Sequence, residues 1–348
     1  MPDTPYLELD VQRMSRNIAR LERQLAPLGV QLRPHVKTAK SVGIARRMVG
    51  AESGPITVST LREAEAFADA GFDDVFLAYP VVASGPRARR LRDLAERVTL
   101  RVGVDSSEGV ELLAAAVPGL EVLVEVDSGH HRTGVAPDRA GEVAASARAV
   151  GLQVAGVFTF PGHSYAPEER KSAAADEALA LSVAASALQA VGIEPRIRSG
   201  GSTPTAALSD GEVLTELRPG VYVFQDAQQA ELGSTDLADV ALTAVATVVS
   251  RGRDRAVLDS GSKVLAADRA AWATGYGRLP DFPDARVVAL SEHHATVTFT
   301  GPAPAVGERV RVAPNHVCTA VNLADELVVV DGGVEVDRWR VAARGANT

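Results

Sequence analysis

The first two-thirds of this 348-residue chain repeatedly alternate β-rich runs with Ala/Leu/Arg-rich stretches. Several of these β-rich runs are continuous in Val, Leu and Phe, as expected for parallel strands that are buried on both faces. The segments between them carry apolar residues at a period near 3.6, as 11–28 does, which indicates helices. Eight strand-then-helix units predict a (β/α)8 barrel, with an open doubly wound sheet as the alternative.

The expected barrel strands are the eight β-rich runs Gln31–Val36, Ile56–Ser59, Asp74–Tyr79, Thr99–Asp105, Glu121–Asp127, Gln153–Phe160, Arg196–Gly200 and Leu217–Phe224. After about Asp236 the pattern changes to short Val/Thr-rich segments separated by turns, such as ALTAVATVVS, HATVTFTG and ELVVVDGG. This second pattern predicts an antiparallel β domain. We therefore expect a barrel over residues 1–236 and a β domain over residues 237–348.

Charge and composition narrow the class of partner. The chain has 36 Lys and Arg against 44 Asp and Glu, a net charge of −8, which argues against nucleic acid or an anionic membrane. Cys318 is the only cysteine, so no intrachain disulfide can form. The longest mostly apolar stretch, Ala238 to Val249, is too short to span a bilayer, and the first residues lack an apolar signal core. A cytoplasmic enzyme with a small-molecule substrate is expected.

Polar residues follow the predicted strands at the ends where barrel enzymes carry their active sites. Lys37 follows the first strand, Arg132 the fifth, and His163 and Tyr165 the sixth, while Tyr222 lies within the eighth. These side chains are expected to face one pocket. A lysine in such a pocket is desolvated, which lowers its pKa and makes its amine nucleophilic. The alternative is an ordinary exposed loop lysine.

The segment SGGST, Ser199 to Thr203, ends the seventh predicted strand and is a candidate anion cradle. Glycines let backbone N–H groups approach a phosphate, and Ser202 and Thr203 add hydroxyl donors. The alternative is a glycine-rich turn that caps a helix.

A candidate metal site lies in APNHVCTAVNL, where His316 and Cys318 are two residues apart. In an extended segment such residues point to the same face, so an imidazole and a thiolate can share one metal ion. Zn²⁺ suits this pair of donors, and two protein ligands leave positions open, as in a catalytic site. The alternative is a buried cysteine beside a hydrogen-bonded histidine. His293 and His294 are adjacent, point to opposite faces of a strand, and are expected at the surface.

Taken together, the motifs resemble those of the D-serine dehydratase and D-threonine aldolase family, whose barrel is shared with alanine racemase. The resemblance covers nearly the whole chain. Its matching stretches are Pro-His-x-Lys-Thr at 34–38, Asp-x-Gly-x-x-Arg-x-Gly-Val at 127–135, Gly-His-Ser-Tyr at 162–165, Ser-Gly-Gly-Ser-Thr-Pro at 199–204, Glu-x-Arg-Pro-Gly-x-Tyr-x-Phe-x-Asp at 216–226, and the metal pair.

The resemblance implies pyridoxal phosphate bound covalently to Lys37 and Zn²⁺ bound by His316 and Cys318. It implies catalytic roles for Lys37, His163, Tyr165 and Arg132. The cofactor-binding residues that it implies are Lys37, Ser199, Gly200, Gly201, Ser202, Thr203 and Tyr222. It also implies a homodimer.

The activity implied by the resemblance is that of a lyase acting on D-β-hydroxy amino acids. D-serine dehydratase, which forms pyruvate and ammonia, is expected first, because the dehydratases of this family resemble the chain in having His-x-Cys. A D-threonine or D-3-hydroxyaspartate aldolase, giving glycine and an aldehyde, is the alternative, although such aldolases more often have His-x-Asp. Two further alternatives are less favoured. An amino-acid racemase needs no metal, so the His316 and Cys318 pair argues against it, and a non-catalytic pyridoxal-phosphate-binding protein lacks the C-terminal β domain that this chain is expected to have.

Overall fold

The structure is a computed structural model in which residues 2–348 are described. These residues form two compact units. The barrel unit contains residues 21–37, 45–220 and 346–348. The sheet unit contains the residues up to Arg20 together with 38–44 and 221–345. Each unit has its own sheet and is described separately below.

The barrel unit is built on eight parallel strands in the order β2-β9-β8-β7-β6-β5-β4-β3. A β-bridge between His35 and Thr57 joins the two edges of this sheet, so the strands form a nearly closed barrel. The (β/α)8 prediction is therefore confirmed over the open sheet. The strands are β2 (Gln31–Leu32), β3 (Pro55–Val58), β4 (Asp74–Pro80), β5 (Thr99–Val104), β6 (Glu121–Glu125), β7 (Gln153–Phe158), β8 (Ile197–Gly200) and β9 (Glu216–Leu217).

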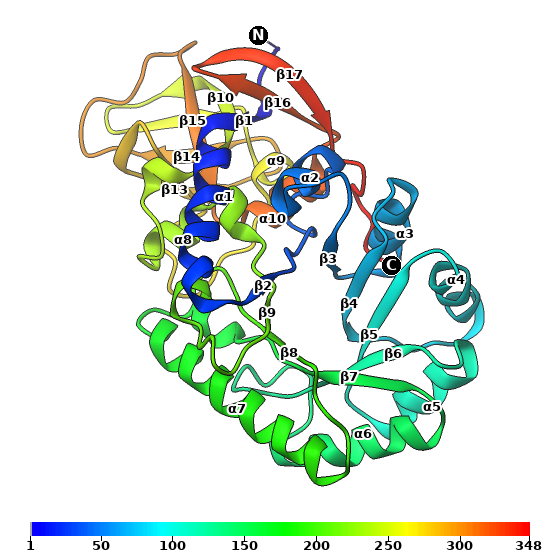
Figure 1. The fold of residues 1–348 in the computed structure, drawn as a ribbon. Coiled ribbons are helices and arrows are strands. Elements are labelled where there is room, and N and C mark those ends of the chain that lie inside the picture. The colour runs from blue at the N-terminus through cyan, green and yellow to red at the C-terminus, as the bar shows by residue number, and fades with distance from the viewer. Residues whose placement is uncertain (1) are drawn as a thin grey trace. The chain divides into compact units, whose positions relative to one another are not determined.

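Helices connect these strands, and Figure 1 shows α3 to α7 on the outside of the strands that they join. They are α3 (Leu61–Asp69), α4 (Gly85–Ala95), α5 (Ser107–Ala116), α6 (Ala140–Ala149) and α7 (Arg170–Ala190), with 3-10 turns η2 (Pro137–Arg139), η3 (Gly162–Tyr165) and η4 (Ala206–Leu208). Helix α3 shows why they form: Thr60 caps its N-terminus by accepting a hydrogen bond from the Glu63 N–H, and Leu61 and Phe67 bury one face. No helix in residues 2–348 is long and apolar enough to cross a membrane.

Aromatic side chains fill part of the barrel interior. The rings of Phe76 on β4 and Phe158 on β7 meet edge to face at 5.0 Å, and Leu123 and Ala155 pack with them. Gly103 on β5 lies against this pair, and a Cβ atom there would come within 2.6 Å of the Phe158 ring. A side chain at Gly103 would therefore displace the ring.

The sheet unit contains nine strands in the order β11-β14-β13-β12-β15-β10-β1-β16-β17, paired antiparallel except for β1 with β16. This confirms the predicted C-terminal antiparallel domain. The strands are β1 (Tyr6–Asp10), β10 (Leu242–Arg251), β11 (Arg255–Leu258), β12 (Gly277–Leu279), β13 (Phe282–Leu290), β14 (Ala295–Thr298), β15 (Arg309–Pro314), β16 (Glu326–Asp331) and β17 (Val334–Arg340). The sequence boundary at 236/237 assigned β1 to the barrel, whereas its backbone pairs with β10 and β16.

The eighth predicted strand, Leu217–Phe224, is shorter than expected. Strand β9 ends at Leu217, and Tyr222 lies in the 3-10 turn η5 (Val221–Val223) of the sheet unit. Pro219 explains the break, because proline has no N–H to continue a strand ladder. The remaining helical elements are α1 (Val11–Leu25), η1 (Ala26–Leu28), α2 (Val42–Val49), α8 (Ala227–Glu231), η6 (Leu237–Asp239), α9 (Ser262–Leu265) and α10 (Val317–Leu323).

Candidate active site

A pocket of about 300 Å³ opens at the carboxyl ends of the barrel strands. Its lining residues follow or end seven of the eight strands, as the barrel rule predicts. They are His35, Lys37, Ser59, Ala78, Tyr79, Arg132, Thr133, Phe160, Gly201 and Arg218. They include one lysine and two arginines, with His35 as a fourth potential cation, and none of them is a carboxylate. The pocket is therefore suited to an anionic ligand.

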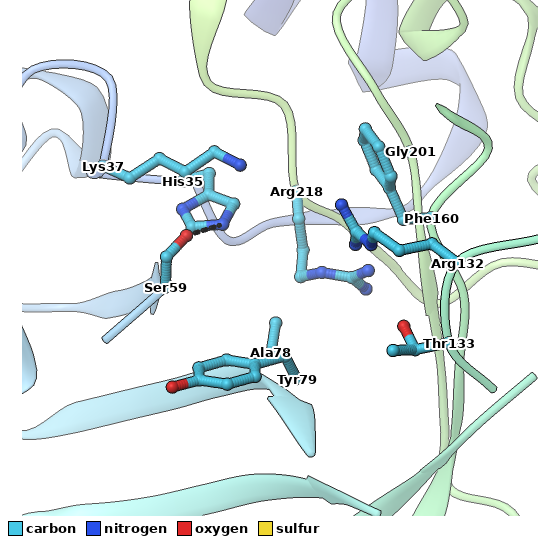
Figure 2. Close-up of a pocket in the computed structure, with 10 residues that line it drawn as sticks. All are labelled: His35, Lys37, Ser59, Ala78, Tyr79, Arg132, Thr133, Phe160, Gly201 and Arg218. Atoms are coloured by element: carbon cyan, nitrogen blue, oxygen red, sulfur yellow. Dashed lines mark hydrogen bonds between the residues drawn. The ribbon is translucent and has the colours of Figure 1, made fainter. Parts of the chain in front are cut away.

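Lys37 lies in a turn just after the His35–Thr57 bridge that joins the barrel edges. In Figure 2 its side chain and that of Arg132 extend toward one another from opposite sides of the pocket. The structure thus places Lys37 in a pocket, as predicted for a cofactor-binding lysine. Lys37 lies at this end of the barrel because it comes two residues after His35, where the pairing with Thr57 ends and the chain turns.

His35 is a pocket residue that belongs to the Pro-His-x-Lys-Thr motif but was not among the predicted site residues. Its Nε2 atom lies 3.4 Å from the Ser59 hydroxyl, and its Nδ1 atom is buried without a hydrogen-bond partner among residues 2–348. Burial lowers the pKa of His35 well below its usual value, and the nearby cations Lys37 and Arg218 lower it further. His35 is therefore neutral at pH 7 and can accept or donate a hydrogen bond.

Arg132 reaches the pocket from the loop after β6. Asp127 fixes this loop, because its carboxylate accepts hydrogen bonds from the N–H groups of Gly129 (2.9 Å) and His131 (3.0 Å). The Arg132 guanidinium lies 5.2 Å from the centre of the Phe160 ring. Within residues 2–348 it makes no side-chain hydrogen bond and no salt bridge, so its five donors remain for a ligand.

Arg218 is a second arginine in the pocket and was not among the predicted site residues. It is fully buried, donates to the Ser199 hydroxyl and to the Thr159 carbonyl (2.6 Å), and contacts the rings of Phe76 and Phe158. Burial lowers its pKa from the usual value, which is far enough above neutrality for the charge to remain. An arginine directly after an apolar barrel strand was the sequence signal that could have identified it.

The predicted phosphate cradle is only partly at the pocket. Gly201 lines the pocket, in the left-handed conformation with φ of 86° that favours glycine. Its N–H, however, donates to the buried carboxylate of Glu177, and the Ser202 N–H donates to the Thr205 hydroxyl at 3.0 Å. A Cβ atom on Gly200 would come within 2.3 Å of the Glu177 carboxylate. A phosphate bound here must use donors other than these two N–H groups or displace their partners.

His163 and Tyr165 lie in η3 and are not among the residues that line the pocket. The His163 Nε2 atom is 3.2 Å from an Asp176 carboxylate oxygen. The Tyr165 ring is 6.3 Å from the ring of Phe160, which does line the pocket. Catalytic roles for His163 and Tyr165 therefore stay predictions.

The predicted metal ligands lie together in the sheet unit at the start of α10. His316 is the N-cap residue of this helix and Cys318 is in its first turn, so the assumption of an extended segment was wrong. The Cys318 Sγ atom is 3.2 Å from the Thr38 hydroxyl and forms a hydrogen bond with His316. Asp226 holds the helix start, because its buried carboxylate accepts from the Val317 N–H at 3.2 Å.

The donor chemistry of this pair fits a metal ion such as Zn²⁺. The His316 Nδ1 atom lies 2.6 Å from the Asp268 carboxylate, so Nε2 is the ring nitrogen that remains for a metal. A thiolate and an imidazole are the donors that Zn²⁺ prefers. Within residues 2–348, no group of three or more His, Cys, Asp and Glu side chains is arranged to hold a metal ion. The pair therefore provides at most an open site.

The second histidine pair lies at the surface, as expected. The His293 side chain is 68% exposed and lies 4.0 Å from the Glu292 carboxylate and 3.5 Å from the Lys263 amine. It has no place in the pocket or in the metal pair.

Comparison with known proteins identifies the family to which the chain belongs. The family model for the alanine racemase N-terminal domain matches residues 9–228, and a serine dehydratase domain model matches residues 241–330. The chain is 36% identical to D-threo-3-hydroxyaspartate dehydratase from Delftia sp., over 96% of both proteins. The chain belongs to the D-serine dehydratase and D-threonine aldolase family. Another member, D-threonine aldolase from Arthrobacter sp., is 32% identical over 99% of this chain and 93% of its own length.

The solved structures agree with this family membership. The structure of the Delftia sp. dehydratase superposes with a TM-score of 0.90 and 32% identity, covering 98% of this chain and 97% of that one. The alanine-racemase-like fold of the family supports pyridoxal phosphate as the cofactor. One solved variant of that dehydratase has a cysteine changed to alanine and is metal-free, and another has a changed histidine two positions earlier. His316 and Cys318 have the same order and spacing.

Proposed function

We propose that this protein is a pyridoxal-phosphate- and zinc-dependent dehydratase of D-β-hydroxy amino acids. The observation that carries the proposal is the cationic pocket at the strand ends, where Lys37 lies with Arg132 and Arg218. The relatives support the reaction class, because the named dehydratase and aldolase both act on D-hydroxy amino acids. D-serine remains the substrate predicted from the sequence.

The residues of the pocket fit the cofactor. Pyridoxal phosphate is anionic, and the pocket offers three basic side chains with no carboxylate among its lining residues. When bound, the cofactor supplies an electron sink for negative charge at the substrate Cα. We assign Lys37 to hold it, with Gly201 and Arg218 at the wall, and we keep Ser199, Gly200, Ser202, Thr203 and Tyr222 as proposed cofactor-binding residues.

Three residues that line the pocket have separate proposed roles. Lys37 would hold the cofactor and would act as the base that takes the substrate Cα proton. Arg132, whose guanidinium lies against the Phe160 ring, would bind a substrate carboxylate. His35, which burial and its cationic neighbours keep neutral, lines the same pocket and can accept or donate a hydrogen bond there.

Zinc binding by His316 and Cys318 completes the proposal. A bound zinc ion supplies a Lewis acid toward a hydroxyl leaving group. The chain contributes one imidazole and one thiol, with Asp268 and Thr38 in contact with them. Loss of water rather than cleavage of the Cα–Cβ bond is favoured by Cys318, because the dehydratase relative has a cysteine whose replacement accompanies a metal-free form.

A second substrate is favoured by a specific observation. The pocket contains two arginines besides Lys37, and the dehydratase relative acts on D-threo-3-hydroxyaspartate, which carries a second carboxylate. Such a substrate would give oxaloacetate and ammonia. The aldolase alternative, with glycine and an aldehyde as products, rests on the D-threonine aldolase relative.

The test is a panel of amino acids with products identified. Purified protein with cofactor and zinc is offered D-serine, D-threonine, D-threo-3-hydroxyaspartate and the matching L-isomers. We expect an oxo acid and ammonia from D-isomers only. Glycine with an aldehyde as the sole products would replace the dehydratase by the aldolase, and equal rates on D- and L-serine would refute the stereochemical assignment. Light scattering tests the proposed homodimer, and cell fractionation tests the proposed cytoplasmic location.

A further inference from the structure

Asp268 lies on the loop after α9, and its two carboxylate oxygens contact His316 and Thr319, which stand on either side of Cys318. One oxygen is 2.6 Å from the His316 Nδ1 atom, and the other accepts a hydrogen bond of 2.7 Å from the Thr319 hydroxyl. The Thr319 hydroxyl also lies 2.9 Å from the His316 carbonyl oxygen. Asp268 therefore joins the imidazole to the first turn of α10, where Cys318 lies.

These contacts determine which nitrogen of His316 faces outward. A neutral imidazole has one N–H, and a carboxylate beside Nδ1 holds the proton there. The lone pair is then on Nε2, and the ring cannot rotate about its Cβ–Cγ bond without losing the 2.6 Å contact. Asp268 thus selects both the tautomer and the orientation of the ring.

A partner that holds the His316 ring in place matters for metal binding in this chain. Among residues 2–348 no cluster of three His, Cys, Asp or Glu side chains is arranged around a metal position, so Asp268 does not complete a ligand set. With two protein ligands, metal affinity depends on holding each donor in place before the ion arrives. A carboxylate beside a metal-binding imidazole typically changes metal affinity by about 10- to 100-fold.

We propose that Asp268 is a positioning residue that fixes His316 for metal binding, with Thr319 orienting the Asp268 carboxylate. The inference rests on the metal site of the proposed function and assigns a residue that neither the motifs nor the relatives indicate. Asp268 acts through His316 and does not itself bind the ion. Thr319 contributes by fixing the second oxygen, so its loss has a smaller effect.

The experiment measures metal affinity and requires no turnover. Holoenzyme is stripped of metal by a chelator, dialysed, and titrated with Zn²⁺ against a coloured competing chelator. Titration with Co²⁺ reports the thiolate–metal absorption. The variants are Asp268→Ala, Asp268→Asn and Thr319→Val. Asp284→Ala is the matched control, because Asp284 is an exposed aspartate of the same unit. Melting temperatures of the metal-free proteins are compared.

We expect Asp268→Ala to weaken zinc binding by roughly 10- to 100-fold. Asp268→Asn keeps an oxygen that can accept from Nδ1–H and should retain more of the affinity, while Asp284→Ala should bind as the wild type does. Should Asp268→Ala fail to fold, Asp268→Asn and Thr319→Val carry the test through a smaller loss of affinity. Unchanged affinity in the folded variants at this site would overturn the assignment.

Two further results separate this inference from the proposed function. If the wild type binds no zinc, or binds it equally well after His316→Ala, the metal site itself fails and the role of Asp268 fails with it. If X-ray absorption of the zinc-loaded protein shows that Asp268→Ala removes an oxygen ligand while the imidazole stays bound, Asp268 is a ligand and not a positioning residue. If the wild type binds zinc and Asp268→Ala binds it with the same affinity, the role of Asp268 is refuted while the metal site of the proposed function stands.

Discussion

The Oε1 atom of Glu177, on α7, accepts a hydrogen bond of 2.5 Å from the backbone N–H of Gly201. This carboxyl group is fully buried, and its second oxygen has no hydrogen-bond partner within residues 2–348. Burial raises the pKa of Glu177 to about 7, although the Gly201 N–H and the charge of Arg218 act in the opposite direction. A titratable group therefore lies directly behind the pocket wall.

Glu177 should make stability depend on pH between about 4.5 and 7. Below pH 4.5 the carboxyl is protonated in both states, so its contribution is fully present. As pH rises toward 7 the unfolded carboxyl ionises first, and stability is lost until the folded one ionises too. The shift from 4.5 to about 7 corresponds to a loss on the order of 3 kcal/mol. Urea unfolding at pH 5, 6, 7 and 8 should show Glu177→Gln gaining stability over the wild type only as pH rises. Parallel pH curves would contradict this, and the exposed Glu111→Gln serves as control.

Lys37→Ala should abolish the visible absorbance of the bound cofactor and reduce turnover by at least about a hundredfold, because the cofactor loses its covalent attachment and Cα loses its base. The measurement is the absorbance spectrum of the purified protein with a kinetic assay on its best substrate. Lys171→Ala, an exposed lysine of the barrel unit, should leave both unchanged. A Lys37→Ala enzyme with normal turnover would remove this residue from the mechanism.

Arg132→Leu should raise KM for the D-amino acid by roughly 10- to 100-fold, since hydrogen bonds to charged groups contribute about 1.5–3 kcal/mol. Arg132→Lys should restore part of the loss through its charge, but without paired donors. Steady-state kinetics of both variants decide the matter. Arg139→Leu is the control, because Arg139 is exposed and pairs only with Glu142. A wild-type KM in Arg132→Leu would mean that another group binds the carboxylate.

Cys318→Ala and His316→Ala should each lose bound zinc and dehydration activity, while the melting temperature falls by no more than a few degrees. The reason is that two ligands form an open site, in contrast to the four of a structural zinc. Metal analysis, product assay and thermal melting measure the three effects. Collapse of the fold on chelation would make the site structural, and full activity after verified metal removal would make the pair ordinary core residues.

The barrel could be predicted from the sequence because buried parallel strands are local apolar runs, and each of the eight predicted runs overlaps a strand, the eighth by Leu217 alone. Lys37 and Arg132 could be placed for the same reason, since a residue that follows a barrel strand lies at the active end. The expected cofactor came from the resemblance to the family, because no local pattern in the chain specifies pyridoxal phosphate, whereas the spacing of His316 and Cys318 by itself suggested a metal site.

The parts that escaped prediction depend on contacts between distant residues. Asp268 precedes His316 by 48 residues, and no periodicity connects a loop aspartate with a particular histidine. In the sequence, Glu177 cannot be distinguished from the other polar residues of a long helix, although in the fold it is buried against Gly201. The start of helix α10 was assumed to be extended chain, and the contact that holds it comes from another segment, where Asp226 accepts a hydrogen bond from the Val317 N–H.

Strand β1 has a consequence for how the molecule is made. It is the first strand of the chain, yet it lies between β10 and β16, with Leu7 opposite Ala244 and Glu8 opposite Val328. On the ribosome its partners emerge only after more than two hundred further residues have been added. Leu7 and Leu9, buried in the finished sheet, must stay exposed or sheltered until then. Completion of this sheet therefore depends on contacts between residues more than two hundred positions apart, which are intrinsically slow to form.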